Sequence, residues 1–191
     1  LSIALIKYRL LDSFPGIEFK IIGEPESTDS ARYLANADRH QFEWWALSMI
    51  RARPGQPDGD KGKKGADQGI DGIINFIDDP SGKPQKAIVQ VKSGHVSSAY
   101  IRDLVGTIDR VKAAIGILIT LEEPTRPMIK EAAEAGFYHS ILGDKDYPRI
   151  QIRTIDELIN GKTIDLPPSN VSFQKAAKQK LKDEGKQQGL F

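Results

Sequence analysis

Three polar residues on two neighbouring apolar segments are of the types that phosphodiester chemistry needs. Asp71 lies at the start of residues 70–77, while Gln90 and Lys92 lie near the end of residues 86–92. A carboxylate and an amide oxygen suit a hard cation such as Mg²⁺, which keeps several waters and lowers the pKa of one of them. A nearby ammonium can orient the attacking water or offset charge on the phosphoryl oxygens. This set therefore indicates phosphodiester hydrolysis if the fold brings the side chains together.

A β-hairpin is the element that would do so. The two apolar segments are typical of strands, and the segment DDPSGKPQ between them is typical of a turn. If the hairpin closes at the Ser-Gly step of this turn, paired residue numbers sum to 163, and Asp71 lies opposite Lys92 with Gln90 as the diagonal neighbour. The alternate residues form a uniformly apolar face, which we expect to be buried. The polar residues then converge at one end of the other face.

The rest of the sequence predicts an α/β domain with a mixed sheet, because hairpin strands are antiparallel and the later strands are reached through helical crossovers. The wholly apolar residues 115–120 should form a central strand. Apolar spacing and capping residues predict the other elements, namely helices at residues 1–11, 39–51, 99–113, 126–136 and 155–160, and strands at residues 19–22 and 149–153.

Composition excludes several classes of function. The 191 residues include no cysteine, so there is no disulfide framework, thiolate nucleophile or thiolate zinc site. No apolar run reaches the roughly 18 residues of a bilayer span and no signal peptide opens the chain, so we expect a cytoplasmic protein. The formal charge is +1, of which residues 170–191 carry +3 (five lysines against two acids), leaving −2 for residues 1–169.

Longer stretches of the sequence resemble a known family. The runs KGKKGADQGIDGIINF, AIVQVKSGHV and IRDLVGTIDRVKAAIGILITLEEPTRPMIKEAAEAGFY are similar to the Mrr-like branch of the PD-(D/E)xK restriction endonuclease superfamily. They look most like the version fused C-terminally to site-specific DNA methyltransferases. The resemblance covers about residues 38–168. It implies a restriction-endonuclease-like, three-layer α/β/α fold with a central mixed sheet of about four to five strands.

The resemblance also implies roles for individual residues. The acidic residue of the family's first core strand matches Asp71, and the QxK motif of the next strand matches Gln90 and Lys92. A helical glutamate before the hairpin, often a further metal or water ligand, matches Glu43. Gln90 stands where most members of the superfamily carry Asp or Glu. A neutral ligand should hold the metal more weakly than a carboxylate.

Other segments suggest contacts with DNA and a division of the chain. Lys63 and Lys64 belong to a lysine-rich loop before Asp71 that either contacts phosphates or is a solvated charge run. In the geometry of the family, Ser93 and His95 would border the DNA cleft. Residues 1–37 resemble the end of a methyltransferase domain followed by a linker, residues 38–168 form the endonuclease-like domain, and residues 169–191 form a basic tail that we expect to be poorly ordered.

The first hypothesis for function is therefore a Mg²⁺- or Mn²⁺-dependent endonuclease for double-stranded DNA, the restriction arm of a restriction-modification system. Cutting both strands requires two active sites, so we expect a homodimer. A second hypothesis is a catalytically silent DNA-binding module that assists a fused or associated methyltransferase. A third is a junction-resolving or repair nuclease on the same fold.

Overall fold

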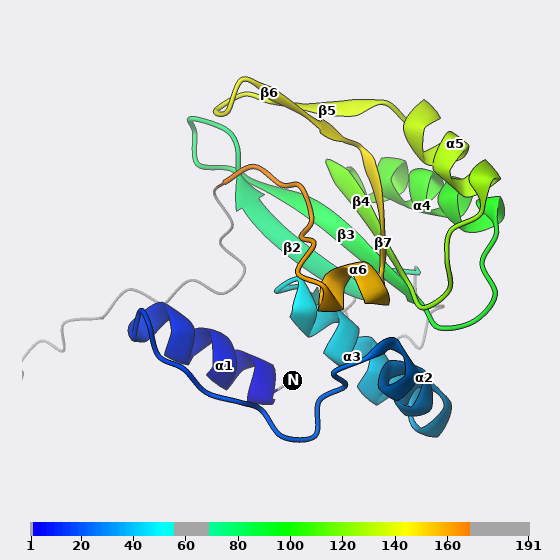
Figure 1. Ribbon diagram of the computed structural model, residues 1–191. Coiled ribbons are helices and arrows are strands. Elements are labelled where there is room, and N and C mark those ends of the chain that lie inside the picture. Colours follow the sequence, from blue (N-terminus) through cyan, green and yellow to red (C-terminus); the bar gives the residue numbers. More distant parts are fainter. Residues whose placement is uncertain (1, 56–68, 169–191) are drawn as a thin grey trace, which may run out of the picture.

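A five-stranded mixed sheet forms the centre of the protein, seen here in a computed structural model that describes residues 2–55 and 69–168 (Figure 1). Its strand order is β1-β2-β3-β4-β7. Neighbours in the first three strands run antiparallel, and β4 and β7 continue the sheet parallel to β3. The bounds are Arg53–Pro54 (β1), Gly72–Ile77 (β2), Pro84–Lys92 (β3), Ile115–Thr120 (β4) and Ile150–Thr154 (β7). The predicted α/β class with a mixed sheet is confirmed.

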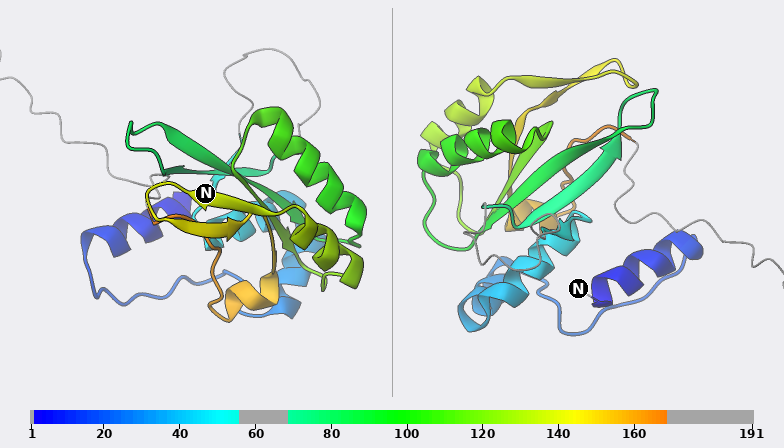
Figure 2. Two further views of the ribbon diagram at one scale, coloured as in Figure 1. Left: turned by 90° about the horizontal axis from the view of Figure 1, so that it is seen from above. Right: turned by 180° about the vertical axis from the view of Figure 1, so that it is seen from behind.

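Helices cover both faces of this sheet and give it three layers (Figure 2). Helices α3 (Arg39–Met49) and α6 (Ile155–Ile159) pack on one face, and α4 (Ser98–Val111) and α5 (Arg126–Glu134) pack on the other. Each face has its own apolar core, so the predicted α/β/α arrangement is also confirmed. In the part of the chain that the structure describes, no helix is long and apolar enough to cross a membrane.

Burial along the strands explains the sequence patterns. Strand β2 alternates between buried and half-buried residues, whereas all six residues of β4 are buried. A parallel strand with helices on both faces has no solvent side, which is why its sequence IGILIT shows no alternation. The sequence predicted β4 to be central. It is an interior strand, but β3 is the middle one.

The N-terminal part differs from the sequence prediction at two places. Helix α1 (Ser2–Ser13) is present as expected, but the strand predicted at residues 19–22 does not form. The polar stretch that follows contains helix α2 (Thr28–Ala37), which the sequence analysis missed because three of its five apolar residues are alanine. The sequence feature that marks the start of α2 is local, because Ser27 and Ser30 form a reciprocal capping box there.

A second, two-stranded sheet was also missed. It consists of β5 (Phe137–Ser140) and β6 (Lys145–Pro148), which pair antiparallel. The side chain of Asp78, directly after β2, ties this hairpin to the central sheet. Its carboxylate is 1% exposed and accepts four hydrogen bonds, from the hydroxyls of Tyr138 and Ser140 (2.6 Å each) and from the backbone N–H groups of Ile141 and Leu142 (3.1 Å each).

These bonds make the stabilising contact between Asp78 and the β5–β6 hairpin dependent on pH. Burial of the carboxyl opposes ionisation, but the four hydrogen bonds outweigh it and lower the pKa of Asp78 below its usual value. A carboxyl with a lowered folded-state pKa stabilises the fold above its unfolded pKa of about 4, and this stabilisation is lost as the pH falls through the folded-state pKa.

We therefore expect Asp78→Asn to lower the free energy of unfolding at pH 7 by about 2–3 kcal/mol, because the amide cannot accept all four bonds. The difference from the unmodified protein should narrow below about pH 4. Urea unfolding at several pH values measures both effects. The matched control is Asp79→Asn in the neighbouring turn, which should cost clearly less because the Asp79 carboxylate accepts its hydrogen bond from the N–H of Ser81 at the surface. Equal losses for the two variants would contradict the role of Asp78.

Candidate active site

Asp71 is bound to strand β3 through both its backbone and its side chain. Its N–H donates to the carbonyl oxygen of Val89 (2.9 Å), and its carboxylate Oδ2 accepts a hydrogen bond from the N–H of Val91 (2.6 Å). The side chain takes the place that a further backbone carbonyl would have in the ladder. These two bonds lie on either side of Gln90, so the carboxylate is fixed beside the QxK segment.

The hairpin register differs from the prediction by two residues. Ile73 pairs with Ile88 and Asn75 with Lys86, so paired residue numbers sum to 161 instead of 163. The reason lies in the turn, where the N–H of Gly82 donates to the carbonyl of Asp79 (2.8 Å) and centres the turn one residue earlier. Because the shift is even, no side chain changes face. The predicted pairing of Asp71 with Lys92 is wrong, however, because the observed register continued to Asp71 places Gln90 opposite it and Lys92 two residues further along β3.

The predicted division of the hairpin into two faces therefore holds. The face expected to be buried belongs to the core under α3, with Ile74, Phe76, Ala87, Val89 and Val91. The opposite face is not open along its length as a simple hairpin would be, because α4 covers Ile88 and buries it in the second core. The candidate site is thus confined to the end of the hairpin near Asp71 and Lys92.

Helix α3 places Glu43 near Asp71, and Gly72 allows α3 to pack closely against the start of β2. A Cβ atom at residue 72 would lie 2.4 Å from Cδ2 of Leu47, a distance that real contacts do not reach. Leu47 is one helical turn after Glu43 and is buried in the core. The glycine beside Asp71 therefore admits a core side chain of the helix that carries Glu43.

Gln90 occupies a tight place at the end of β3. Its side chain is 4% exposed, and no hydrogen bond joins its amide to any residue within the described ranges. A Cβ at residue 69 would lie 3.1 Å from Nε2 of Gln90, and Gly69 has a φ of +68°, so a larger residue there would be strained and would press on the amide. The amide is thus enclosed at the end of β3, next in the chain to Val91, whose N–H binds the Asp71 carboxylate.

Lys92 completes the group at the carboxyl end of β3. Its side chain is half-buried, and its Nζ lies 5.3 Å from the ring centroid of Tyr100 on α4. Lys92 pairs in the sheet with Thr120 of β4. Thr120 is fully buried, and its hydroxyl has no hydrogen-bond partner in the described parts of the chain.

The charges of these residues act on one another. Burial of the side chain raises the pKa of Glu43, and the negative charge of Asp71 raises it further, while His40, Arg39 and Lys92 act in the opposite direction. Two carboxyl groups that repel each other and an ammonium close by are the electrostatic arrangement of a cation-binding hydrolytic site. The structure thus brings Glu43, Asp71, Gln90 and Lys92 to the same end of the hairpin.

The donor set fits Mg²⁺ in one particular mode. The described residues contain no group of three or more His, Cys, Asp or Glu side chains that could hold a metal ion. Mg²⁺, however, is commonly held by one or two carboxylates and keeps waters and substrate phosphates as its other ligands. Asp71 uses only Oδ2 for its bond to Val91, and Glu43 and Gln90 are the residues that would supply further oxygen ligands.

The predicted DNA contacts are placed only in part. Ser93 is half-buried and His95 is exposed, and both lie between the end of β3 and Ser97, the N-cap of α4. They are therefore next to Lys92 in the chain. Lys63 and Lys64 lie outside the described residues.

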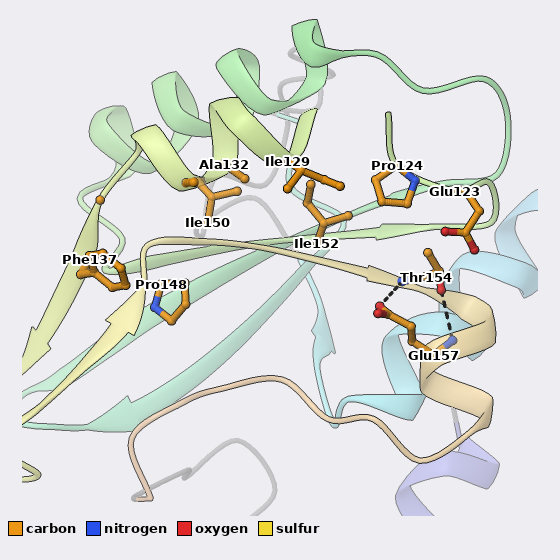
Figure 3. Close-up of a pocket in the computed structure, with 12 residues that line it drawn as sticks. Glu123, Pro124, Ile129, Ala132, Phe137, Pro148, Ile150, Ile152, Thr154 and Glu157 are labelled. Atoms are coloured by element: carbon orange, nitrogen blue, oxygen red, sulfur yellow. Dashed lines mark hydrogen bonds between the residues drawn. The ribbon is translucent and has the colours of Figure 1, made fainter. Parts of the chain in front are cut away.

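An apolar hollow lies elsewhere, between α5 and strand β7 (Figure 3). Its volume is about 370 Å³, and none of the predicted site residues lines it. Apolar side chains such as Ile129, Phe137 and Ile152 form its walls, and Glu123 and Glu157 lie at one end. Two carboxylates at its rim would repel a phosphate backbone, so the hollow is not a candidate site for DNA.

The raised pKa of Glu43 leads to a prediction for the metal-free protein. A carboxyl with a raised folded-state pKa contributes stability that is fully present below its unfolded pKa and is lost as the pH rises through the folded-state pKa. Glu43→Gln should therefore increase the free energy of unfolding at pH 7.5 by up to about 1 kcal/mol, and the increase should vanish near pH 4. Urea unfolding in EDTA measures this, with Glu123→Gln as an exposed control. A loss of stability at pH 7.5 would show that Glu43 is a structural residue.

Comparisons with known proteins identify the family of this chain. A solved structure described as the MspJI restriction endonuclease in complex with a 27-mer oligonucleotide is similar, with a TM-score of 0.48 and 16% identity over 75% of this chain and 33% of that chain. No curated protein matches. A family model described as NACHT-associated inactive restriction endonuclease 1 matches residues 53–160, which are 108 of the 191 residues. The chain therefore belongs to the family of NACHT-associated inactive restriction endonuclease 1 domains.

Proposed function

We propose that this restriction-endonuclease-like domain is a metal-dependent endonuclease for double-stranded DNA, of the Mrr-like type with a D…QxK motif. The observation that carries the proposal is the convergence of Asp71, Gln90, Lys92 and Glu43 from three elements, with the Asp71 carboxylate bonded to β3 between Gln90 and Lys92. Burial of the apolar residues does not require polar groups at the end of the hairpin. The placement of two carboxylates, an amide and an ammonium there is therefore not explained by formation of the core.

Each residue has a distinct task in this proposal. Asp71 and Gln90 hold the metal through side-chain oxygens, and Glu43 supplies a further ligand or accepts a proton from the attacking water. The bound ion lowers the pKa of a coordinated water and offsets charge on the phosphate. Lys92 orients the nucleophile or stabilises charge that develops on the phosphoryl oxygens.

The second candidate is a catalytically silent DNA-binding module, and two observations favour it. The family to which the chain belongs is described as inactive. In addition, Gln90 is a neutral ligand where a carboxylate would bind Mg²⁺ more strongly. The four site residues, Glu43, Asp71, Gln90 and Lys92, favour activity in this chain. A catalytically silent module would not require a lysine beside two carboxyl groups.

The partners and biological setting remain predictions. Double-stranded DNA, a homodimer and an attached or associated methyltransferase follow from the sequence hypothesis of a restriction-modification system. The family description names a NACHT association instead. A pull-down with each kind of domain would separate these two settings without bearing on the chemistry.

Nicking of supercoiled plasmid tests the proposed activity. With Mg²⁺ or Mn²⁺ the unmodified protein should nick, EDTA should stop the reaction, and Asp71→Ala and Lys92→Ala should each lower the rate about a hundredfold or more. Matched controls are Asp146→Ala and Lys130→Ala, whose side chains are 64% and 78% exposed and lie away from the site. Binding of DNA in a gel-shift assay without any nicking would support the silent module, and nicking that persists in both site variants would refute the assigned site.

Replacing the neutral ligand tests the metal site directly. Gln90→Glu should tighten Mn²⁺ binding by roughly tenfold, because it adds a carboxylate to the ligand set. It should also destabilise the metal-free protein, since the new charge is buried beside Asp71. Isothermal titration and urea unfolding measure the two effects, and Gln85→Glu on the same strand is the control. An unchanged Mn²⁺ affinity would remove Gln90 from the ligand set.

A further inference from the structure

The ammonium of Lys92 is close to acidic residues and yet forms no ion pair with them. Its charge acts on Glu43, but no carboxylate oxygen in the described part of the chain lies within 4.0 Å of Nζ. The contact that the structure gives this ammonium is the ring of Tyr100, with 5.3 Å between Nζ and the ring centroid. This distance is within the roughly 6 Å over which an aromatic ring attracts a cation.

A ring and a carboxylate have different consequences for a metal site. An ion pair between Lys92 and Asp71 or Glu43 would use the same oxygen atoms that a divalent cation needs, and it would cancel part of their charge. The face of a tyrosine ring attracts the ammonium through its quadrupole and carries no net charge. The ring can therefore fix the ammonium while both carboxyl groups stay available to the cation.

Tyr100 itself is firmly placed. It lies in the first turn of α4, where its N–H donates to the carbonyl oxygen of Ser97 (3.1 Å). Its half-buried side chain packs against the second apolar core, in which Ile101 and Leu104 of the same helix are fully buried. The ring is thus attached to the rigid helix that covers the sheet, and it does not depend on the short loop after β3.

The ring, and not the hydroxyl, makes this contact. No hydrogen bond joins the Tyr100 hydroxyl to a residue of the described ranges. Beside Lys92 on the sheet, Thr120 is buried and its hydroxyl is without a partner, so this neighbour does not hold the ammonium either. The phenyl face is what remains to keep Lys92 away from the acidic pair.

We propose that Tyr100 is a positioning residue for the site, whose ring holds the ammonium of Lys92 without neutralising the carboxyl groups that bind the metal. This inference rests on the proposed nuclease function and extends it to a residue outside the D…QxK motif. It requires that an aromatic ring at position 100 be sufficient and that an aliphatic side chain be insufficient.

The test compares Tyr100→Phe with Tyr100→Leu in the full chain, with Tyr100→Met as a second ring-free variant should the leucine variant fold poorly. Tyr33→Leu on α2, where the side chain is 76% exposed, is the control. We expect the ring-free variants to nick supercoiled plasmid about three- to thirtyfold more slowly at saturating Mn²⁺ and DNA. Their Mn²⁺ affinity in isothermal titration should fall severalfold, because the released ammonium pairs with the carboxylates, whereas the phenylalanine variant should keep both values within about twofold.

A double-mutant cycle separates positioning from a structural effect. In a Lys92→Met background, Tyr100→Leu should no longer change Mn²⁺ affinity, because there is no ammonium left to release. A persisting effect there, a phenylalanine variant as impaired as the leucine one, or ring-free variants that match the unmodified protein would each overturn the inference while plasmid nicking stands. If the unmodified protein neither binds Mn²⁺ nor nicks, the proposed function itself is overturned together with this role of Tyr100.

Discussion

The hydrogen bond from the N–H of Val91 to the Asp71 carboxylate is the interaction on which the rest of the site depends. It joins a residue at the start of β2 to the middle strand of the sheet by a side chain instead of a backbone carbonyl. One carboxylate oxygen is thereby fixed within the ladder and the other is left for a ligand. Because a β-sheet is stiff, this bond gives Asp71, Gln90 and Lys92 relative positions that a surface loop would not maintain.

The sequence predicted the polar hairpin face correctly and its register incorrectly, and the reason is physical. Faces follow from the two-residue alternation of apolar side chains, which is a strong energetic signal over Ile74, Phe76, Ala87 and Val89. The register follows from which residues form the turn, and several placements of a turn within DDPSGKPQ satisfy the same alternation. An error of an even number of residues leaves every face assignment unchanged, so the predicted site residues of the hairpin still share one face.

The parts that the sequence did not predict are those with weak local patterns or long-range partners. Helix α2 is short and three of its five apolar residues are alanine, and the β5–β6 hairpin is exposed on much of its surface, so the apolar signal of both is weak. The hairpin is held by Asp78, more than sixty residues away in the chain from its partners Ile141 and Leu142. The sequence analysis also did not identify Tyr100 as a site residue. An aromatic residue at the start of an amphipathic helix is typical of a core position, and the sequence alone does not show that Lys92 lies against its ring.

The contact between Leu47 and Gly72 has a consequence for how activity is judged across this family. A methyl group at residue 72 would lie 2.4 Å from Cδ2 of Leu47, in the apolar interior and one helical turn from Glu43. In the proposed nuclease, a glycine-to-alanine change at residue 72 would displace the Leu47 side chain or the helix that carries Glu43, while every motif residue stayed the same. The presence of every motif residue therefore does not establish that a relative is catalytically competent. The size of residue 72 is a simple criterion for separating relatives that keep this packing from those that do not.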